Sequence, residues 1–247
     1  MKIKAIITGH SRGLGAAIAT NLVQRGIPTL GIARHTLPLA DSLGPGLLEE
    51  ITLDLADSMQ LAGWLAGPTL ANWVLGSSRV VLINNAGVLA PVGALPVQDA
   101  QAIAKAVSLN VAAPLMLASA VVSAGDPGQD RRIVHISSGA ARHAYAGWSV
   151  YCATKAALDQ HARAVELDQT PGLRICSLAP GLIDTDMQAV IRATAMQAFP
   201  MRDRFEALKR HGKLASPQDC AAKLVSYVLG DTFGQMAVAD LRDFASP

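Results

Sequence analysis

The sequence predicts an α/β fold in which helices cover both faces of a doubly wound parallel sheet. Short runs rich in Ile, Val or Leu alternate with longer, alanine-rich helical patterns, and turn or cap residues follow each short run. Alternation of this kind implies right-handed β-α-β crossovers and therefore a parallel sheet. No internal repeat, low-complexity tract or linker interrupts the chain, so we expect residues 1–247 to form a single domain.

The same patterns predict six strands and four helices. We expect strands at Ile3–Thr8, Thr29–Ala33, Leu48–Asp54, Val80–Asn84, Ile133–Ser137 and Arg174–Leu178. We expect helices at Leu14–Arg25, Ser58–Leu75, Val97–Ser123 and Val150–Leu167. Two segments are less regular, His35–Pro45 and Ile183–Lys213, and such loops gather where ligands bind, beyond the carboxyl ends of the strands. We therefore expect a substrate lid at residues 183–213.

Composition excludes several classes of function. A net charge of +2, spread along the chain, does not fit a protein that binds nucleic acid or an anionic membrane. The histidines form no H-x-x-x-H pair, so we expect no metal site. The three cysteines, Cys152, Cys176 and Cys220, show no paired spacing, which favours reduced thiols and a cytoplasmic protein.

One segment has the composition of a membrane span. Residues Ala106–Gly125 carry no charge and are long enough to cross a bilayer. Pro114 and several polar side chains interrupt the segment, and the apolar run after Lys4 is too short for a signal-peptide core. We expect a soluble protein with no membrane partner, in which this segment is a helix buried against the sheet or a partner subunit.

The stretch "ITGHSRGLGAA" joins the first predicted strand to the first predicted helix. Glycine at Gly9, Gly13 and Gly15 permits a tight turn and close approach of a phosphate, while the helix N-terminus supplies unpaired N–H donors. The spacing G-x-x-x-G-x-G differs from the standard dinucleotide fingerprint G-x-G-x-x-G. Taken alone, the stretch is also compatible with a glycine-rich turn that binds nothing.

Tyr151 and Lys155 in "YCATK" are four residues apart and share one helix face. A tyrosine with a pKa of about 10 needs about 4 kcal/mol of preferential stabilisation of its phenolate to titrate near pH 7, and a partly desolvated lysine beside it can supply this. The pair alone is equally compatible with an incidental contact on a solvated helix. Ser138, thirteen residues before Tyr151, either hydrogen-bonds a substrate carbonyl or caps a turn.

Six motifs occur together in one order. They are "TGHSRGLG", "NNAG" at residues 84–87, Asn110 in "SLNVAAP", Ser138, "YCATK", and "PGLIDTDM" at residues 180–187. In this combination the chain resembles the short-chain dehydrogenase/reductase family over roughly its first 190 residues. The glycine-rich loop and the C-terminal ending are more similar to the sepiapterin and benzil reductase branch than to the acyl-carrier reductases. The ending "FGQMAVADLRDFASP" lacks the family's frequent glycine-rich close, which leaves the final strand and any C-terminal subunit contact open.

The resemblance implies a Rossmann-type sheet, a nicotinamide cofactor and a catalytic tetrad of Asn110, Ser138, Tyr151 and Lys155. Ser138 and Tyr151 would hold the substrate carbonyl, and Tyr151 would give a proton to the developing alkoxide after hydride transfer. Lys155 would lower the tyrosine pKa and hold the cofactor ribose. Asn110 would position a water that links Lys155 to solvent.

The resemblance also implies where the cofactor lies. Asn85, Ala86 and Gly87 would border the adenosine ribose, Asp54 and Leu55 would flank the adenine, and Ile183 and Thr185 would meet the nicotinamide amide. The full set of implied cofactor-binding residues is Gly9, Ser11, Arg12, Gly13, Leu14, Gly15, Arg34, Asp54, Leu55, Asn85, Ala86, Gly87, Tyr151, Lys155, Pro180, Gly181, Ile183 and Thr185.

Two arginines predict which nicotinamide cofactor binds. Enzymes that use NAD commonly place a carboxylate after the second strand to hold the ribose 2′-hydroxyl. Here that strand ends "LGIARH", and the first acid after it is Asp41. Arg34 and Arg12 can converge on the adenosine ribose, where two guanidiniums favour the 2′-phosphate of NADP(H). The alternative is that both are solvated surface arginines.

We expect an NADPH-dependent reductase of a small-molecule carbonyl substrate, either a ketone or a vicinal diketone. A 3-oxoacyl-thioester reductase is the alternative within the enzymes, and an NADP(H)-sensing regulator without turnover is the alternative outside them. The intact Ser138, Tyr151 and Lys155 disfavour the regulator. The apolar surfaces of Ala106–Gly125 and of the helix from Val150, together with the family's habit of pairing these helices, predict a homodimer or homotetramer.

Overall fold

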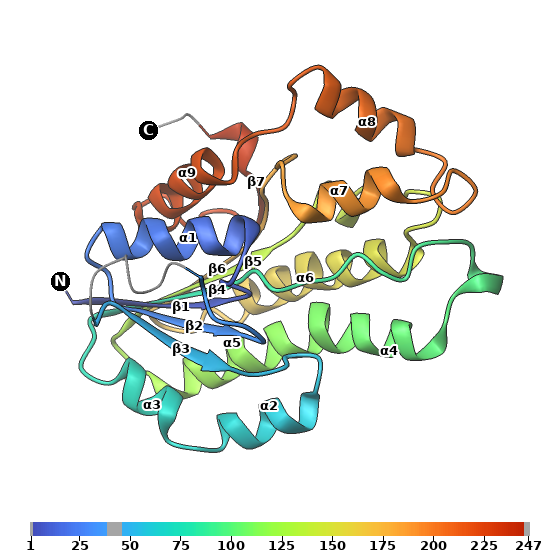
Figure 1. Ribbon diagram of the computed structural model, residues 1–247. Coiled ribbons are helices and arrows are strands. Elements are labelled where there is room, and N and C mark those ends of the chain that lie inside the picture. Colours follow the sequence, from blue (N-terminus) through green and yellow to red (C-terminus); the bar gives the residue numbers. More distant parts are fainter. Residues whose placement is uncertain (1, 39–45, 245–247) are drawn as a thin grey trace.

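The computed structural model describes residues 2–38 and 46–244, and within them one parallel sheet organises the chain (Figure 1). The strand order is β3-β2-β1-β4-β5-β6-β7. The strands are β1 (Ile3–Thr8), β2 (Thr29–Ala33), β3 (Leu48–Thr52), β4 (Arg79–Asn84), β5 (Asp130–Ile136), β6 (Leu173–Ala179) and β7 (Val238–Asp240). The predicted doubly wound α/β fold is confirmed. Of the predicted loop His35–Pro45, residues 39–45 lie outside the described residues.

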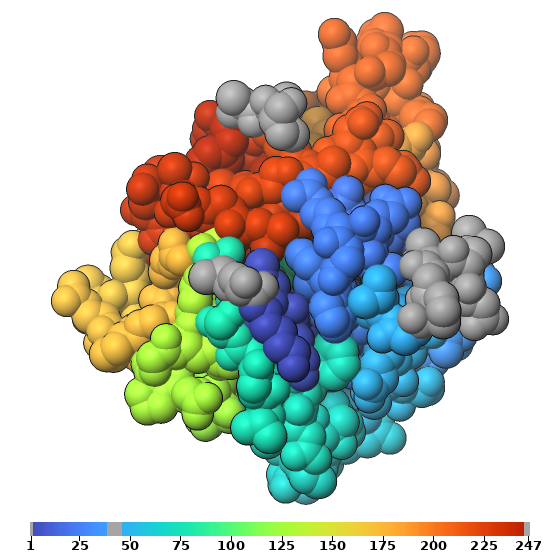
Figure 2. Space-filling model, turned by 90° about the vertical axis from the view of Figure 1, so that its left-hand side faces the viewer, coloured from blue at the N-terminus to red at the C-terminus, as the bar shows by residue number. Residues whose placement is uncertain are grey.

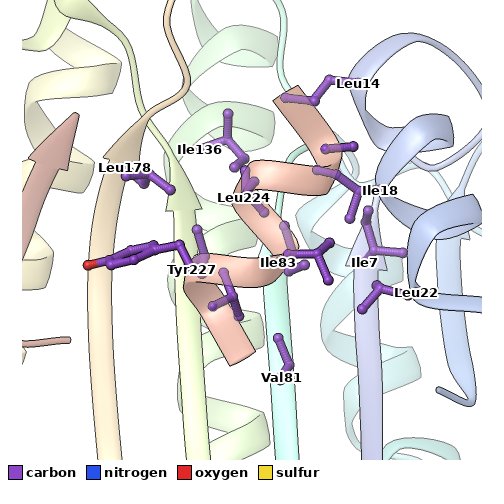
Figure 3. Packing of buried hydrophobic residues seen from close by; sticks show 14 of the residues in the cluster. Ile7, Leu14, Ile18, Leu22, Val81, Ile83, Ile136, Leu178, Leu224 and Tyr227 are labelled. Atoms are coloured by element: carbon purple, nitrogen blue, oxygen red, sulfur yellow. The ribbon is translucent and has the colours of Figure 1, made fainter. Parts of the chain in front are cut away.

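Helices cover the two faces of the sheet unequally. The face that Figure 3 shows packs against α1 (Gly13–Gln24) and α9 (Pro217–Leu229), and fully buried aliphatic side chains such as Ile7, Ile18 and Leu224 fill the space between them. The opposite face packs against α2 (Ser58–Leu65), α3 (Thr69–Val74), α5 (Ala113–Ala124) and α6 (Ser149–Leu167), and α4 (Ala100–Val107) lies against α6. Because both faces are covered, the strands are near-continuous apolar runs.

Two predicted helices are each interrupted. The segment Ser58–Leu75 forms α2 and α3, because Gly67 and Pro68 lie between them and proline cannot continue the hydrogen-bond ladder of a helix. The segment Val97–Ser123 begins only at Ala100, where Asp99 caps the first turn by accepting a hydrogen bond from the Ala102 amide. It is then broken by a π-helical turn at Ser108–Ala112.

The α4–α5 segment is the part of the described chain that is long and apolar enough to span a membrane by length and composition. Leu117 and Val121 of α5 point into the core beneath the sheet. This placement agrees with the expectation of a helix that packs against the sheet.

The C-terminal third is more regular than predicted. Residues 183–213 contain α7 (Asp186–Ala193) and α8 (Arg202–Arg210), and the orange segment that includes α8 stands out from the body of the molecule (Figure 2). The chain then forms α9 and the edge strand β7, which pairs with β6 from Val238 to Asp240. The final strand that the sequence left open is therefore present, as a three-residue strand.

Candidate active site

The predicted site residues gather at the carboxyl ends of β1, β4, β5 and β6. The strand order reverses between β1 and β4, which lie side by side although β2 and β3 come between them in the sequence. Ligands of open α/β sheets bind in the crevice at such a reversal. The glycine-rich loop follows β1, and Asn85, Ala86 and Gly87 follow β4, so the two segments meet at this crevice.

Contacts hold these two segments together. The Thr8 hydroxyl accepts hydrogen bonds from the amides of Asn85 and Ala86, each at 3.0 Å. The Asn85 side chain donates to the carbonyls of Thr8 and Gly9. A Cβ at Gly15 would lie 2.0 Å from the Gly9 carbonyl oxygen, so only glycine fits there. Gly9 itself has a φ of +68°, a conformation that glycine adopts without strain.

The N-terminus of α1 fits the pyrophosphate of a dinucleotide. Arg12 is the N-cap residue and makes no side-chain cap, and the first turn of this fully described helix contains no acidic residue. Its amide donors and the positive end of the helix dipole therefore face an anion-binding position. Thr185 lies close to Gly13, with 3.5 Å between its Cγ2 and a Cβ built there. Arg12 itself reaches Asp186 at the start of α7, with 3.5 Å between Nη1 and Oδ2.

Tyr151 and Lys155 lie on one face of α6, and both side chains are buried. The Lys155 ammonium donates a hydrogen bond of 2.7 Å to the carbonyl of Ile136, the last residue of β5, and lies 5.7 Å from the centroid of the Tyr151 ring. Ser138 follows β5 and caps the 3₁₀ turn Gly139–Ala141, where its hydroxyl accepts a hydrogen bond from Ala140. The structure thus brings the three predicted residues together.

The pKa of Tyr151 departs from the prediction. Burial raises it to about 12, against the lowering effect of a hydrogen bond with Ser138. Burial lowers the pKa of Lys155 to about 8, and Asp159 acts in the raising direction. The predicted approach of the Tyr151 pKa toward 7 is wrong for the protein without ligand, because desolvation of the phenolate outweighs the hydrogen bond with Ser138. At neutral pH the phenol therefore keeps its proton, which is the state that a proton donor needs.

Asn110 lies in the π-helical turn between α4 and α5 and is fully buried. Its side-chain amide donates to the Val88 carbonyl and its oxygen accepts from the Val88 amide, both at 2.8 Å. A Cβ at Gly87 would lie 3.3 Å from Asn110 Oδ1 and 3.6 Å from Lys155 Nζ. Gly87 therefore lets the β4 loop pass between Asn110 and Lys155. A π-helical turn such as the one that carries Asn110 often marks a functional position.

The remaining predicted cofactor residues are placed less directly. Arg34 is exposed after β2. Asp54 accepts a hydrogen bond from the Ala56 amide. The side chains of Leu55 and Ile183 are buried in the hydrophobic clusters on opposite faces of the sheet. Gly181 has a φ of +86° and lies against the aliphatic part of Arg242.

Sequence reasoning missed an aromatic cluster over Tyr151. The Trp148 ring stacks on Phe199 with 4.4 Å between centroids and contacts Tyr151 edge-on at 5.7 Å. Phe205 of α8 packs against Trp148 and Phe199. The cluster joins the predicted lid to α6 and buries the phenol. The signal was present in the sequence, because only 4% of the residues are aromatic and two of them fall in residues 183–213.

A second missed contact involves the glycine-rich loop. His10 is buried, and its Nε2 lies 2.6 Å from Glu50 Oε1 on β3. The same oxygen accepts a hydrogen bond from the Leu37 amide. Gly31 leaves room for the His10 ring, since a Cβ there would lie 2.6 Å from Nδ1. Glu50 thus connects the loop after β1 to the segment that follows Arg34.

A glycine-rich turn at a helix N-terminus, beside a buried tyrosine–lysine pair and a serine, defines a dinucleotide-dependent oxidoreductase. The family model described as short chain dehydrogenase matches residues 4–196, and the chain belongs to that family. Members of the family use nicotinamide cofactors. This chain is similar to a benzil reductase ((S)-benzoin forming) of Bacillus cereus, with 34% identity that covers 93% of this chain and 95% of the relative.

Two further similarities extend over nearly the whole chain. A sepiapterin reductase of Meriones unguiculatus is 35% identical, and the match covers 96% of this chain and 95% of that protein. The crystal structure of a short-chain dehydrogenase/reductase from Burkholderia vietnamiensis is 47% identical, covers 99% of both chains and has a TM-score of 0.72. The chain is therefore an oxidoreductase of this family, and its finer specificity is a separate question.

Proposed function

We propose that the protein is an NADPH-dependent carbonyl reductase that acts on ketones or vicinal diketones. The observation that carries the proposal is the convergence of Ser138, Tyr151 and Lys155 at the carboxyl end of β5, beside the glycine-rich turn. The relative of Bacillus cereus is named for the reduction of benzil, a vicinal diketone, which supports this substrate class.

Each residue of the proposed tetrad has a role that its position supports. The Ser138 hydroxyl hydrogen-bonds the substrate carbonyl, and the Tyr151 phenol, protonated at neutral pH, donates its proton to the oxygen as negative charge develops there. Lys155 uses one donor on Ile136 and has further donors for the cofactor ribose. Asn110 fixes the β4 loop beside Lys155. When bound, NADPH supplies the hydride.

Two arginines support NADPH over NADH. Arg34 is exposed after β2, and Arg12 is exposed at the N-terminus of α1. A guanidinium near the adenosine ribose forms charge-assisted hydrogen bonds with a 2′-phosphate and finds no such partner in NADH. Arg34 and Arg12 lie on the loops after neighbouring strands, β2 and β1.

We further propose a soluble, cytoplasmic homodimer or homotetramer with one domain and a lid at residues 183–213. The three cysteines are free, which agrees with a reducing compartment. Less than half of the most apolar window of α4–α5 is buried, and Val107 is 43% exposed. An uncovered apolar helix face favours assembly. Light scattering at micromolar concentration tests this assembly, and a monomer would contradict it.

The function is tested by measuring oxidation of NADPH and NADH with benzil, simple ketones and an acetoacetyl thioester. We expect kcat/KM to favour NADPH by about two orders of magnitude, from charge-assisted contacts of roughly 1.5–3 kcal/mol each. Arg34→Asp should lose most NADPH activity and gain some with NADH. Arg25→Asp, an exposed arginine at the other end of α1, is the matched control and should keep the preference.

Each alternative has its own result in the same assay. Turnover of the thioester without turnover of any diketone would replace the proposal with a 3-oxoacyl-thioester reductase. Tight NADPH binding without turnover of any carbonyl would replace it with a sensing regulator. Equal kcat/KM for the two cofactors would remove the role assigned to Arg34 and Arg12.

A further inference from the structure

Asp159 is a buried carboxylate that the proposed reaction does not use. It lies on α6, one helical turn after Lys155, and is 2% exposed. The hydroxyls of Ser137 and Ser177 each donate to its Oδ1 at 2.7 Å. Arg142 donates from Nε to its Oδ2 at 3.1 Å. A carboxylate buried to this extent persists only with such partners, so their choice shows what it holds in place.

Two of the three partners lie on either side of Ser138. Ser137 precedes Ser138 directly, and its amide also bonds the Leu178 carbonyl of β6. Arg142 follows the 3₁₀ turn that Ser138 caps, and its Nη2 donates to the Ala239 carbonyl of β7 at 3.0 Å. Asp159 therefore fixes both ends of the short segment that carries Ser138, and it does so from the helix that carries Tyr151 and Lys155.

The negative charge of the same carboxylate also acts on Lys155. Residues four apart on a helix are neighbours, and the negative charge of Asp159 raises the pKa of Lys155 against the lowering effect of burial. The other titratable groups around Lys155 are Tyr151 on α6 and His135 on β5. Arg142 and Cys176 lie on the far side of Asp159, next to its carboxylate.

We propose that Asp159 is a positioning residue of the active site, which anchors the Ser138 segment at both ends and supplies the negative charge that faces Lys155. The inference rests on the proposed function for its kinetic part alone. Its electrostatic part concerns the protein without substrate or cofactor. Arg142 belongs to the same group of contacts, because it binds the Asp159 carboxylate and ends the turn that follows Ser138.

Four variants separate the two roles. Asp159→Asn removes the charge and keeps the shape. Arg142→Gln removes the opposing charge and leaves the Asp159 side chain in place. Ser137→Ala removes one anchor of the Ser138 segment, and Ser177→Ala removes a hydrogen bond of equal length that does not flank Ser138. Arg142 lines an open hollow of about 490 Å³ at the outer edge of the sheet, so its substitution leaves no closed cavity.

The first readout is the titration of Lys155 followed by the ¹³Cε resonance of labelled lysine, assigned with Lys155→Met, in the unliganded protein. Wild-type Lys155 should titrate at about 8. Asp159→Asn should titrate at lower pH and Arg142→Gln at higher pH. A purely structural role would not move the two variants in opposite directions. Movement in the same direction, or none, would overturn the electrostatic role.

The second readout is kcat with the best diketone and saturating NADPH. Ser137→Ala should lower kcat between about tenfold and 100-fold with cofactor KM unchanged, because misplacement of a reacting group by about an ångström has this effect. Ser177→Ala should stay within about twofold of wild type. Equal losses in the two serine variants would refute the anchoring role.

The experiments still test the proposal if Asp159→Asn fails to fold. Thermal unfolding identifies a misfolded Asp159→Asn. In that case Arg142→Gln is sufficient by itself, because a Lys155 pKa that does not rise in this variant would overturn the electrostatic role. If wild type reduces no diketone with NADPH, the proposed function fails, while the titration in unliganded protein still supports or refutes the role of Asp159.

Discussion

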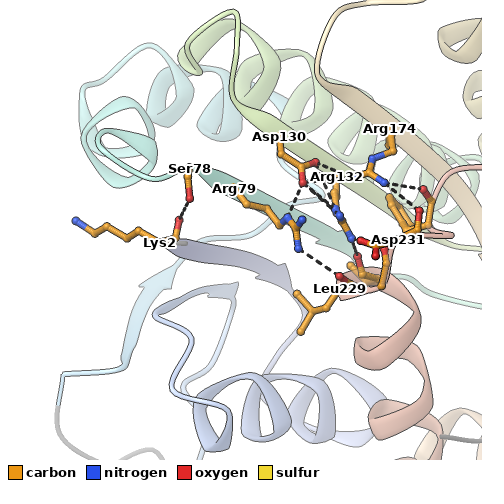
Figure 4. A network of polar contacts seen from close by, with 11 residues as sticks. Lys2, Ser78, Arg79, Asp130, Arg132, Arg174, Leu229 and Asp231 are labelled. Carbon is orange, nitrogen blue, oxygen red and sulfur yellow. Dashed lines mark hydrogen bonds and ion pairs between the residues drawn. The ribbon is translucent and has the colours of Figure 1, made fainter.

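The two ends of the sheet each hold a cluster of buried charge, and the clusters differ in how many protein acceptors their cations have. At the amino ends of β4, β5 and β6, Asp130 meets Arg79, Arg132 and Arg174 (Figure 4). At the carboxyl ends, Lys155 lies between Tyr151 and Asp159 along α6, four residues from each. Arg79 and Arg132 of the first cluster each have several protein acceptors, whereas Lys155 of the second donates to one carbonyl and keeps donors for a ligand.

The arginines of the Asp130 cluster bind backbone carbonyls as well as the carboxylate. Arg79 binds Asp130 at 2.6 Å and the Leu229 carbonyl at 3.2 Å. Arg132 is fully buried and binds the carbonyls of Val228 and Gly230. These carbonyls end α9, where the helix dipole is negative and favours cations. Although burial raises the pKa of Asp130, hydrogen bonds from Arg132 and Arg79 hold it below its usual value.

Lys155 contrasts with these arginines. Its ammonium has three donors, and within the described residues its hydrogen bond goes to the Ile136 carbonyl. Burial lowers its pKa to about 8, and the charge of Asp159 acts in the raising direction. Buried charge alone therefore does not mark a functional site. Unused donors at the carboxyl end of a parallel sheet do.

The largest expected effect is that of Tyr151→Phe. Removing the phenol hydroxyl should lower kcat by about 10³-fold, because the proton donor to the alkoxide is lost, while NADPH binding stays within about twofold. The measurement is steady-state kinetics together with cofactor titration by fluorescence. Tyr227→Phe, the same change at a buried tyrosine of α9, is the control and should leave kcat unchanged. Near wild-type kcat in Tyr151→Phe would rule out the assigned proton donor.

A substitution in the Asp130 cluster, at the opposite end of the sheet, should change stability alone. Asp130→Asn leaves three guanidiniums without their shared carboxylate and should lower the free energy of unfolding by about 4 kcal/mol, with kcat per folded molecule unchanged. Chemical denaturation measures the loss, and Asp126→Asn, an exposed acid four residues earlier, is the control. A loss of kcat without a loss of stability would remove the distinction between the two clusters.

His135 lies between the clusters and predicts an acid sensitivity. It is fully buried, bonds Asn84 and His161 at 3.1 Å each, and burial lowers its pKa to about 3. The unfolded chain binds the proton near pH 6.5, so stability is complete above pH 6.5 and is lost as pH falls toward 3. About 3 kcal/mol should disappear between pH 8 and pH 4 through this residue.

The control for that prediction is a pair of histidine variants. His135→Gln should be less stable than wild type at pH 8 but should lose less stability on acidification, as measured by urea unfolding at a series of pH values. His211→Gln, at an exposed position after α8, should follow wild type. Parallel pH curves for wild type and His135→Gln would show that His135 is not the titrating group.

The sequence predicted the strands well where apolar runs mark them and poorly where charge lies inside a strand. β1 and β2 match their predicted limits, whereas β5 begins at Asp130, three residues before the predicted start. Asp130, Arg131 and Arg132 have the composition of a loop, yet contacts with distant carbonyls bury the two arginines. The edge strand β7 has only three residues, too few for a pattern.

In the candidate site too, features set by nearby residues were predictable, and features set by residues distant in the sequence were not. The spacing of Tyr151 and Lys155 is local, and the structure keeps the pair on one helix face. The Tyr151 pKa is raised by burial, and the cluster that buries the phenol includes Phe199, which is distant from Tyr151 in the sequence. The partners of Asp159 are Ser137, which directly follows β5, Ser177 of β6, and Arg142 at the end of a 3₁₀ turn. No spacing rule in the sequence could have found them.

The smallest expected effect concerns the exposed pair of Arg12 and Asp186, whose side chains are 75% and 73% exposed. An exposed pair of this kind contributes less than about 1 kcal/mol, so Asp186→Asn should leave the unfolding free energy within about 0.5 kcal/mol of wild type. In this variant Arg12 would no longer pair with a carboxylate and would be free to bind the cofactor phosphates. The Kd of NADPH should therefore fall about two- to threefold at low salt.

Salt and a matched variant make this small effect decisive. Screening weakens exposed contacts, so the difference between Asp186→Asn and wild type should vanish in about 1 M salt, where the Debye length is about 3 Å. Asp203→Asn removes an exposed acid of α8 that pairs with Arg202, and it should leave the Kd unchanged. Calorimetric titration with NADPH measures all three proteins. An equal tightening in both variants would mean that the general charge of the lid acts on the cofactor, and that Arg12 and Asp186 have no special relation.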